Sequence, residues 1–232
     1  LIDQYVDIVF LYVVIGFLSI DCGSSRTSNY TDALGIVWAP DATLWPDITR
    51  WSSTSEVSPP GSAELRGFAQ YQTLRYFPPT NASTSHTTPT LNQTKFCYTL
   101  PAIAGAYYLL QSTFWYGSSA STTLYATRIP GFISFWIIVD TYTASQINIT
   151  LPQSSPFSHE MYIQALSGST SVSVCFSAAS DESDAPFINS LQLRPLPADL
   201  TSVAIMSSTN TALHTVARLD FGASEDGPSV IR

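Results

Sequence analysis

Short runs of β-branched and aromatic residues, separated by clusters of Pro, Gly, Asn and Ser, recur along the whole chain of 232 residues. Runs of this kind, bounded by turn residues, are typical of β-strands. No long segment repeats its apolar residues with the period of a helix, and Pro occurs throughout. The predicted strands are 17–20, 35–38, 95–100, 107–116, 132–139, 146–151, 161–166, 171–176, 187–193 and 216–221.

The spacing of these strands predicts an all-β chain in which two antiparallel sheets pack face to face, as a β-sandwich or jelly roll. The Ser/Thr/Pro-rich segments 52–62 and 77–94 are expected to be exposed loops. We expect the sandwich to span 16–197, with 1–15 as an extra apolar N-terminal strand and 198–232 as a C-terminal strand or tail.

The chain is poor in charge. Only 11% of its residues are charged, and the net charge is −8. It therefore has no basic field for a phosphate backbone, which argues against nucleic acid as a partner. Four triplets match the acceptor pattern for N-glycosylation: Asn29, Asn81, Asn92 and Asn148. Attached glycans would keep such a surface soluble and would place the protein outside the cell; the alternative is that these triplets are unmodified surface loops.

The chain contains three cysteines, Cys22, Cys97 and Cys175, each within an apolar, strand-like run. In an oxidising compartment one pair can form a disulfide and leave the third thiol buried or paired between chains. The sequence does not choose among the three pairings. No Cys or His spacing matches a zinc site, so no metal is expected.

The N-terminal segment is uncharged from Ile8 to Ile20. It is shorter than the roughly 20 apolar residues of a membrane-spanning helix, and it lacks the basic start of a signal peptide. Its composition favours a strand, with one face formed by Ile8, Phe10, Tyr12 and Val14. Residues 1–20, fully extended, would span roughly 65 Å, far more than a common strand. We therefore expect this segment to complete the sheet of a neighbouring copy; the alternative is an edge strand of its own domain.

An ordered series of motifs gives the chain a family likeness. They are GFLSIDCG at 16–23, YTD at 30–32, GIVWAPD at 35–41, TLRYFP at 73–78, KFCYTLP at 95–101, YLLQSTFWYG at 108–117, SVCF at 173–176, PFINSLQLRPL at 186–196 and RLDFG at 218–222. Over about 16–222 this series resembles the malectin-like domain of plant receptor-like kinases. The resemblance implies a β-sandwich related to the carbohydrate-binding protein malectin, usually with two lobes in tandem outside the cell. This chain matches the first lobe, and 198–232 would lie where a second begins.

The resemblance also implies a candidate site at the loop end of the sandwich. Sugar recognition needs aromatic faces for the sugar ring and polar groups for its hydroxyls. The nearest counterparts here are Tyr71, Tyr76, Trp115 and Tyr116. Some relatives bind peptides instead of sugars. The alternative for all four aromatics is packing in the core of the sandwich.

Catalytic motifs are lacking in the sequence, which has no nucleophile elbow, zinc-protease motif or phosphate loop. Two acids from distant loops could still form a glycosidase pair, and the acids to examine are Asp41, Asp47, Glu64 and Asp140. We interpret them as turn and cap residues, and 181–184 as a solvated acidic turn with a weak calcium contact as the alternative.

We expect no enzyme, cofactor or membrane span. The favoured hypothesis is a secreted, glycosylated structural subunit of the cell surface or cell wall. Copies would assemble head to tail into a filament through the N-terminal strand, because a head-to-tail contact does not close on itself. The alternative is a carbohydrate- or peptide-recognition module of a cell-surface protein.

Overall fold

A computed structural model describes residues 17–50, 52–61, 65, 67–77, 95–117, 131–140, 142–178, 185–196 and 213–214. The strands are β1 (Leu18–Asp21), β2 (Tyr30–Thr31), β3 (Val37–Pro40), β4 (Ser53–Glu56), β5 (Thr73–Tyr76), β6 (Phe96–Pro101), β7 (Tyr107–Phe114), β8 (Gly131–Val139), β9 (Tyr142–Leu151), β10 (Phe157–Gln164), β11 (Ser171–Ala178), β12 (Phe187–Ile188), β13 (Ser190–Pro195) and β14 (Leu213–His214). The short helices are α2 (Asp41–Leu44), η1 (Pro46–Arg50) and η2 (Ala69–Tyr71).

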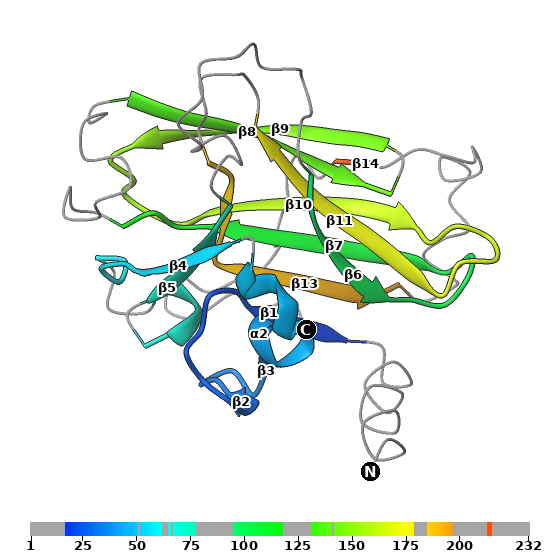
Figure 1. Cartoon of the computed structure of the whole chain (residues 1–232), viewed down its shortest axis with the longest axis horizontal. Helices are drawn as coiled ribbons and strands as arrows, with labels where there is room; N and C mark the ends of the chain where they lie inside the picture. Colours follow the sequence, from blue (N-terminus) through cyan, green and yellow to red (C-terminus); the bar gives the residue numbers. More distant parts are fainter. Residues whose placement is uncertain are drawn as a thin grey trace, which may run out of the picture.

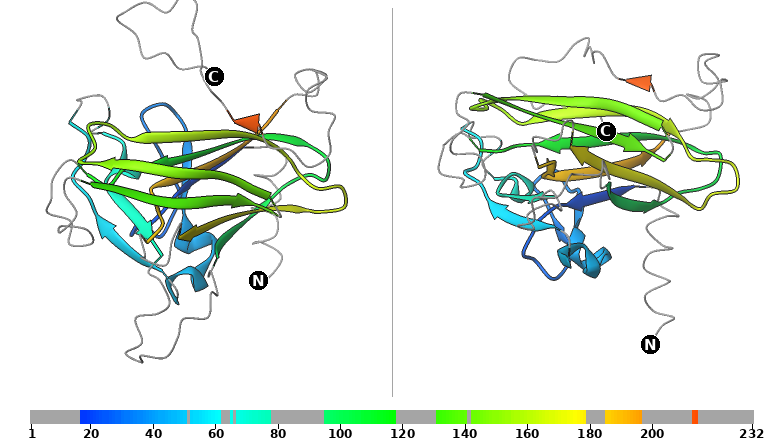
Figure 2. Two further views of the ribbon diagram at one scale, coloured as in Figure 1. Left: turned by 90° about the horizontal axis from the view of Figure 1, so that it is seen from above. Right: turned by 45° about the horizontal axis from the view of Figure 1, so that its top comes forward.

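Two large sheets form a sandwich, which confirms the predicted fold class. The seven-stranded sheet has the order β14-β10-β7-β13-β1-β3-β2, and the four-stranded sheet has the order β6-β11-β8-β9. Figures 1 and 2 show these two sheets stacked on one another, with β4 and β5 at one end. A three-stranded sheet, β12-β5-β4, and a parallel pairing of β1 with β3 were not predicted.

The core lies between the two large sheets and follows from the alternation of side chains along each strand. On β11, Val172, Val174 and Phe176 are buried. Phe114 of β7 contacts the ring of Phe135 edge to face at a centroid distance of 5.4 Å. Large aromatic side chains contribute the most apolar area per residue, so this cluster holds the two sheets together.

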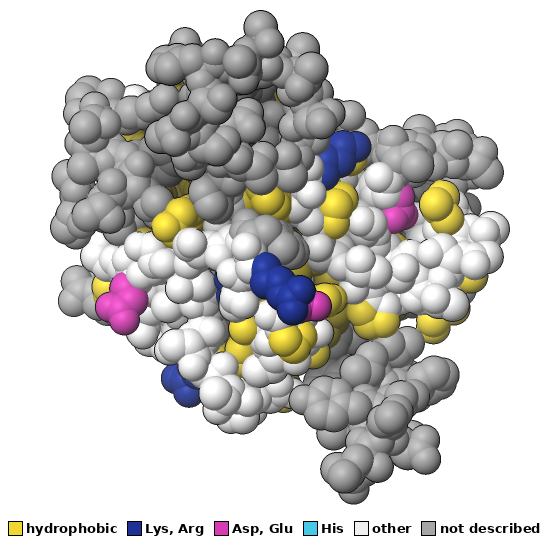
Figure 3. Space-filling view, in the orientation of Figure 1, with side chains coloured by type: hydrophobic (Ala, Val, Ile, Leu, Met, Phe, Trp, Pro, Cys, Tyr) yellow, Lys and Arg dark blue, Asp and Glu magenta, His cyan; other side chains and the backbone are white. Residues whose placement is uncertain are grey.

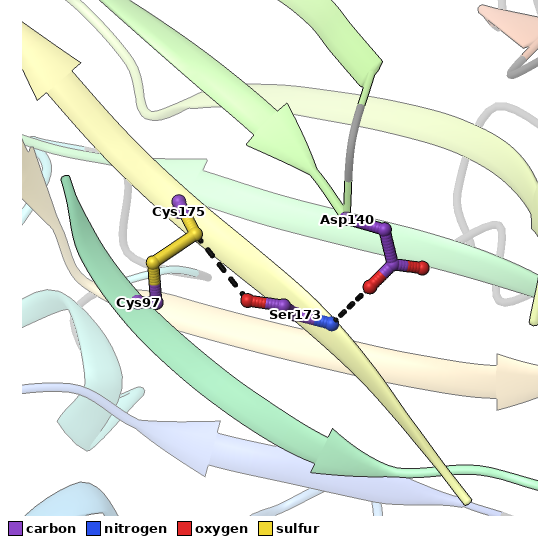
Figure 4. Close-up of a disulfide and its surroundings, with 4 residues drawn as sticks. All are labelled: Cys97, Asp140, Ser173 and Cys175. Atoms are coloured by element: carbon purple, nitrogen blue, oxygen red, sulfur yellow. Dashed lines mark hydrogen bonds between the residues drawn. A yellow bond between two sulfur atoms is a disulfide. The ribbon is translucent and has the colours of Figure 1, made fainter. Parts of the chain in front are cut away.

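A disulfide joins β6 to β11 across directly opposed positions. Cys97 and Cys175 are bonded, their Cα atoms are 4.0 Å apart, and Cys22 remains a buried thiol. Figure 4 shows this bond beside Ser173, whose backbone N–H donates to the Asp140 carboxylate at 2.7 Å. The structure thus selects one of the three pairings that the sequence left open.

Strands β4 and β14 of the structure lie outside the predicted strands. The segment 52–62, expected to be a loop, contains β4, whose sequence Ser-Thr-Ser-Glu is largely exposed and has no apolar alternation. β14 pairs with β10, so the C-terminal segment 198–232 contributes a strand to the seven-stranded sheet. The predicted strand 216–221 and the N-terminal strand 1–15 lie outside the described residues. The proposed domain boundaries therefore stay a prediction.

Candidate functional site

A buried charged centre lies where α2, β5 and β6 meet. Asp41, the first residue of α2, receives hydrogen bonds from Arg75 of β5 through both Nε and Nη2, the latter at 2.8 Å. Tyr98 of β6 donates its hydroxyl to the same carboxylate at 3.0 Å, and the backbone N–H of Gly23 donates at 3.1 Å. Arg75 also donates to the Ser52 hydroxyl at 3.0 Å. One carboxylate thus connects four separate segments of the chain.

This centre is closed to solvent, because the side chains of Arg75 and Asp41 are 1% and 0% exposed. Burial alone would lower the pKa of Arg75, but the hydrogen bonds and charge of Asp41 outweigh it and raise that pKa. Burial raises the pKa of the Tyr98 hydroxyl well above its ordinary value. A fully satisfied and inaccessible ion pair fixes geometry and offers nothing to a substrate. We therefore assign it a structural role.

A second buried acid, Asp21, joins the interior strand β1 to Tyr30 at the start of β2. The Tyr30 hydroxyl donates to Asp21 of β1 at 2.8 Å. Burial raises the pKa of Asp21 to about 6, although hydrogen bonds from Tyr30 and Ser24 oppose that shift. Asp21 therefore changes charge in the mildly acidic range while it accepts the hydrogen bond from Tyr30.

An apolar cleft of about 530 Å³ lies beside α2, β1 and β3 and the β6 edge of the four-stranded sheet. We name it the α2 cleft. It is lined by Leu18, Ser19, Thr27, Ser28, Asn29, Val37, Ala39, Thr43, Leu44, Trp45, Thr99, Pro101, Thr170 and Ser171. Figure 3 shows hydrophobic side chains gathered on the face that carries α2 and β6. A concave, mostly apolar space with a few polar groups is the usual form of a binding site.

The walls of the α2 cleft are set by the buried network behind them. Asp41 begins α2, and Leu44 and Trp45 at its end line the cleft. The Trp45 ring packs edge to face on Tyr98 at a centroid distance of 5.3 Å. None of the described residues that line the cleft carries a charge. The cleft is therefore suited to an uncharged, apolar group.

The four aromatic residues predicted to contact sugar do not line this cleft. Trp115 is 0% exposed, and its indole N–H donates to the carbonyl of Ser58 at 2.7 Å. Tyr116 is 2% exposed and packs against Phe187. Their ring faces are covered by other side chains, which corrects their assignment to sugar contact and agrees with the packing alternative. Tyr71 and Tyr76 are half-buried and pack against the core.

Of the predicted acids, Asp41 belongs to the buried network, and the other described ones lie in an ion pair and a turn. Asp47 forms an exposed ion pair with Arg50 at 3.1 Å. Asp140 sits in a turn, and its backbone N–H donates to the carbonyl of Ser173 at 2.8 Å. Glu64 and the acidic turn 181–184 lie outside the described residues. Among the residues that are described, no group of three or more His, Cys, Asp or Glu side chains could hold a metal ion.

Two of the glycosylation acceptors are described, and both are exposed. Asn29 lines the α2 cleft, and Asn148 lies on β9. The other two acceptors, Asn81 and Asn92, lie outside the described residues, as do the predicted assembly residues Ile8, Phe10, Tyr12 and Val14. Whether any acceptor carries a glycan stays a prediction.

Of the residues that line the α2 cleft, only Asn29 was predicted as a site from the sequence, and then as a glycan acceptor. The lining residues come from six short segments between residues 18 and 171, so no single motif contains them. One local signal was available, namely Leu44 and Trp45 immediately before Pro46 in a short segment with few other apolar residues. Two large apolar side chains at the end of a short helix are the local signal of a packing or binding surface.

Comparisons with known proteins agree with this fold. The model of the malectin-like domain family matches residues 20–232. A probable LRR receptor-like serine/threonine-protein kinase of Arabidopsis thaliana is 28% identical over 89% of this chain and 18% of its own length. The crystal structure of the plant receptor-like kinase FER superimposes with a TM-score of 0.59 at 20% identity, over 86% of this chain and 47% of that one. A structure of the plant peptide RALF23 with FER and LLG2 gives a TM-score of 0.50 at 16% identity, over 78% and 40%.

The chain belongs to the malectin-like domain family. Malectin-like domains of this type are non-catalytic binding modules on the outside of plant cells, and this chain is extracellular. It spans less than a fifth of the length of the curated relatives that it matches.

Across the described segments, no helix is both long and apolar enough for a bilayer crossing.

Proposed function

We propose that this chain is a ligand-recognition lobe that binds an uncharged, apolar segment of an extracellular peptide in the α2 cleft. The observation that carries the proposal is the cleft itself. It offers about 530 Å³ of uncharged space behind which Asp41 and Arg75 hold α2 in position. Because the walls of the cleft are already formed, the loss of conformational entropy on binding is smaller.

The chemistry of the cleft favours a peptide over a sugar. A sugar ring needs exposed aromatic faces and several polar partners for its hydroxyls. Trp115 and Tyr116 are buried, and among the described residues that line the cleft Trp45 is the single aromatic one, beside the aliphatic Leu18 and Leu44. Aliphatic or aromatic peptide side chains gain about 25 cal/mol per Å² of apolar area removed from water in such a space. Among the similar structures, FER occurs in a complex with the peptide RALF23, which adds support from the family.

The test compares two probe sets on the same protein. One is a library of uncharged, acetylated and amidated heptapeptides with a central Leu, Phe or Val, and the other is an array of plant cell-wall oligosaccharides. We expect selective binding from the peptides and none from the oligosaccharides. Binding of oligosaccharides with no peptide selected would overturn the proposal.

A matched pair of variants then locates the site. Val37 lines the cleft and is 37% exposed, whereas Leu34 is 40% exposed and does not line it. Val37→Trp fills the cleft mouth and should weaken peptide binding about tenfold or more, equivalent to at least 1.4 kcal/mol. Leu34→Trp should leave binding unchanged. Equal binding by both variants would place the site elsewhere.

Self-assembly is the second candidate function. Copies of this chain would form a filament by strand addition of the apolar N-terminal segment, which is too long for a common strand. Support comes from Leu18, which begins β1, lines the α2 cleft and follows the segment 1–15 by three residues in the sequence. Sedimentation of the full chain should then show oligomers that grow with concentration, and deletion of 1–15 should leave a monomer. A full chain that stays monomeric at all concentrations would exclude assembly.

A further inference from the structure

The edge of the four-stranded sheet borders the α2 cleft. In the order β6-β11-β8-β9, strand β6 has one neighbour among the described strands, namely β11. Thr99 and Pro101 of this edge strand also line the cleft. An edge strand presents unpaired backbone N–H and C=O groups, which form a template for another extended chain.

The register fixes which residues of β6 face this free side. Opposed residues of an antiparallel pair of strands are of two alternating kinds. In one kind the two residues exchange backbone hydrogen bonds. In the other kind the Cα atoms lie closer, about 4.5 Å apart, and the backbone N–H and C=O groups point away from the partner strand. Cys97 and Cys175 are opposed with Cα atoms 4.0 Å apart, so they form a non-bonded pair. The backbone N–H of Ala102 donates to Thr170 at 2.9 Å, so even-numbered residues bond to β11.

Cys97, Thr99 and Pro101 therefore direct their backbone groups outward. Pro101 agrees with this assignment, because a residue without an N–H is tolerated where the N–H would face away from the ladder. Thr99 is exposed, and within the described residues its backbone N–H and C=O have no partner. The backbone of Thr99 thus offers one hydrogen-bond donor and one acceptor at the rim of an apolar cleft.

We propose that a bound peptide adds to β6 as an extra strand, pairing its backbone with Thr99 and inserting alternate side chains into the α2 cleft. This inference rests on the peptide-binding function proposed above and adds its binding mode. Successive side chains of a strand point to opposite faces. Every second residue of the peptide would therefore enter the cleft, and strand addition would supply the backbone hydrogen bonds.

The occupant is an extended, uncharged, apolar segment of an extracellular partner. The chain has a net charge of −8, yet the described lining of the cleft carries no charge. A charged ligand side chain would lose its hydration there without gaining a partner, whereas an apolar one loses nothing. The Cys97–Cys175 disulfide joins β6 to its neighbour two residues from Thr99. The edge is thus held in place before the peptide arrives.

The experiment removes backbone donors from the peptide without changing its side chains. The probe is the best heptapeptide from the uncharged library, and each position is N-methylated in turn while calorimetry measures the dissociation constant. Methylation of residues whose N–H faces β6 should weaken binding about tenfold, and methylation of the intervening residues should change it less than about twofold. An effect without this alternation, or none, would overturn strand addition.

A pair of variants tests the same contact from the protein side. Thr99→Pro removes the outward N–H and leaves the even-numbered bonds to β11, while Thr99→Val keeps the N–H and nearly the same shape. We expect Thr99→Pro to bind the unmodified peptide about tenfold more weakly than Thr99→Val does, provided that both variants retain the native melting transition. If Thr99→Pro does not fold, the N-methyl series decides alone.

The controls separate this inference from the function on which it rests. If Val37→Trp abolishes binding but the N-methyl series has no periodicity, the cleft binds peptide without adding a strand. If the peptides do not bind at all, both proposals fail. The competing occupant of the β6 edge is the chain's own N-terminal segment, and deletion of 1–15 tests it. A large gain in peptide affinity after deletion would mean that this segment occupies the edge. That result would overturn the assignment to an external partner.

Discussion

The two sides of α2 contrast in chemistry. On the inner side, Asp41 and Arg75 form a fully buried ion pair that is hydrogen-bonded to the hydroxyls of Ser52 and Tyr98. On the outer side, Leu44 and Trp45 border an open space lined without charge. The inner side is closed and satisfied, so it determines position and binds nothing further. On the outer side the side chains are held in position, but the space in front of them is not filled by neighbouring side chains. This side is therefore the surface that can accept a ligand.

Removing one member of the buried ion pair should have the largest effect on stability. Arg75→Met leaves the Asp41 carboxylate buried without its cation, and we expect a loss of about 3–5 kcal/mol in the free energy of unfolding. Chemical denaturation measures this loss. The double variant Arg75→Met with Asp41→Leu should recover much of it, because no uncompensated charge remains. A loss below about 1 kcal/mol for the single variant would contradict the structural role of the pair.

The disulfide fixes the opposite wall of the α2 cleft. It closes a loop with a sequence separation of 78 residues, so its replacement by Ser at Cys97 and Cys175 should cost about 2–5 kcal/mol. The measurement is denaturation of the double variant beside the parent protein. The matched control is Cys22→Ala, which removes the buried free thiol and should cost less. Equal losses would show that packing rather than the crosslink stabilises this region.

Asp21 should make the free energy of unfolding depend on pH. Its pKa is about 6 in the folded protein against an ordinary value of 3.8, so the folded state binds the proton more tightly. Stability from this group is present in full below pH 4 and is lost as the pH rises to about 6. The loss is about 2–3 kcal/mol at 1.36 kcal/mol per pKa unit.

Asp21→Asn tests the sign of this effect. The amide stays neutral and keeps an oxygen that can accept from the Tyr30 hydroxyl. We expect the variant to exceed the parent in unfolding free energy at pH 7 and to match it near pH 4. Thermal unfolding across this range measures both. A variant less stable than the parent at pH 7 would mean that the charged carboxylate is favoured at this position.

Local patterns were sufficient to predict the sandwich but not the small sheet. The first half of β11 alternates half-buried Ser171 and Ser173 with buried Val172 and Val174, so its sequence alone indicates a strand with one face in the core. β4 has the sequence Ser-Thr-Ser-Glu and owes its structure to pairing with β5, the next strand along the chain. Strands of this second kind are set by their partner, and their own residues carry no signal.

The site could not be predicted because it is built from long-range contacts. Asp41 and Arg75 are 34 residues apart, and Asp41 and Tyr98 are 57 apart. The aromatic pair Trp115 and Tyr116 follows a strand end, where a loop position and a core position have the same local sequence. The family resemblance identified the fold and the extracellular location, but it did not indicate which aromatic faces remain exposed.

The smallest effect on stability is expected at Asn29, where the consequence falls on binding instead. Asn29 is exposed and lines the α2 cleft, so a glycan there would stand at the cleft mouth. Asn29→Gln should change the free energy of unfolding by less than about 0.5 kcal/mol. In protein from a glycosylating host it should also lower the mass by one glycan and raise the affinity for the heptapeptide probe. Asn148→Gln on β9 is the matched control, because it removes an acceptor that does not line the cleft. If Asn29→Gln lowers the mass and leaves the affinity equal to that of Asn148→Gln, the glycan does not obstruct the cleft. In that case peptide entry is confined to the side of β6, away from the loop that carries Asn29.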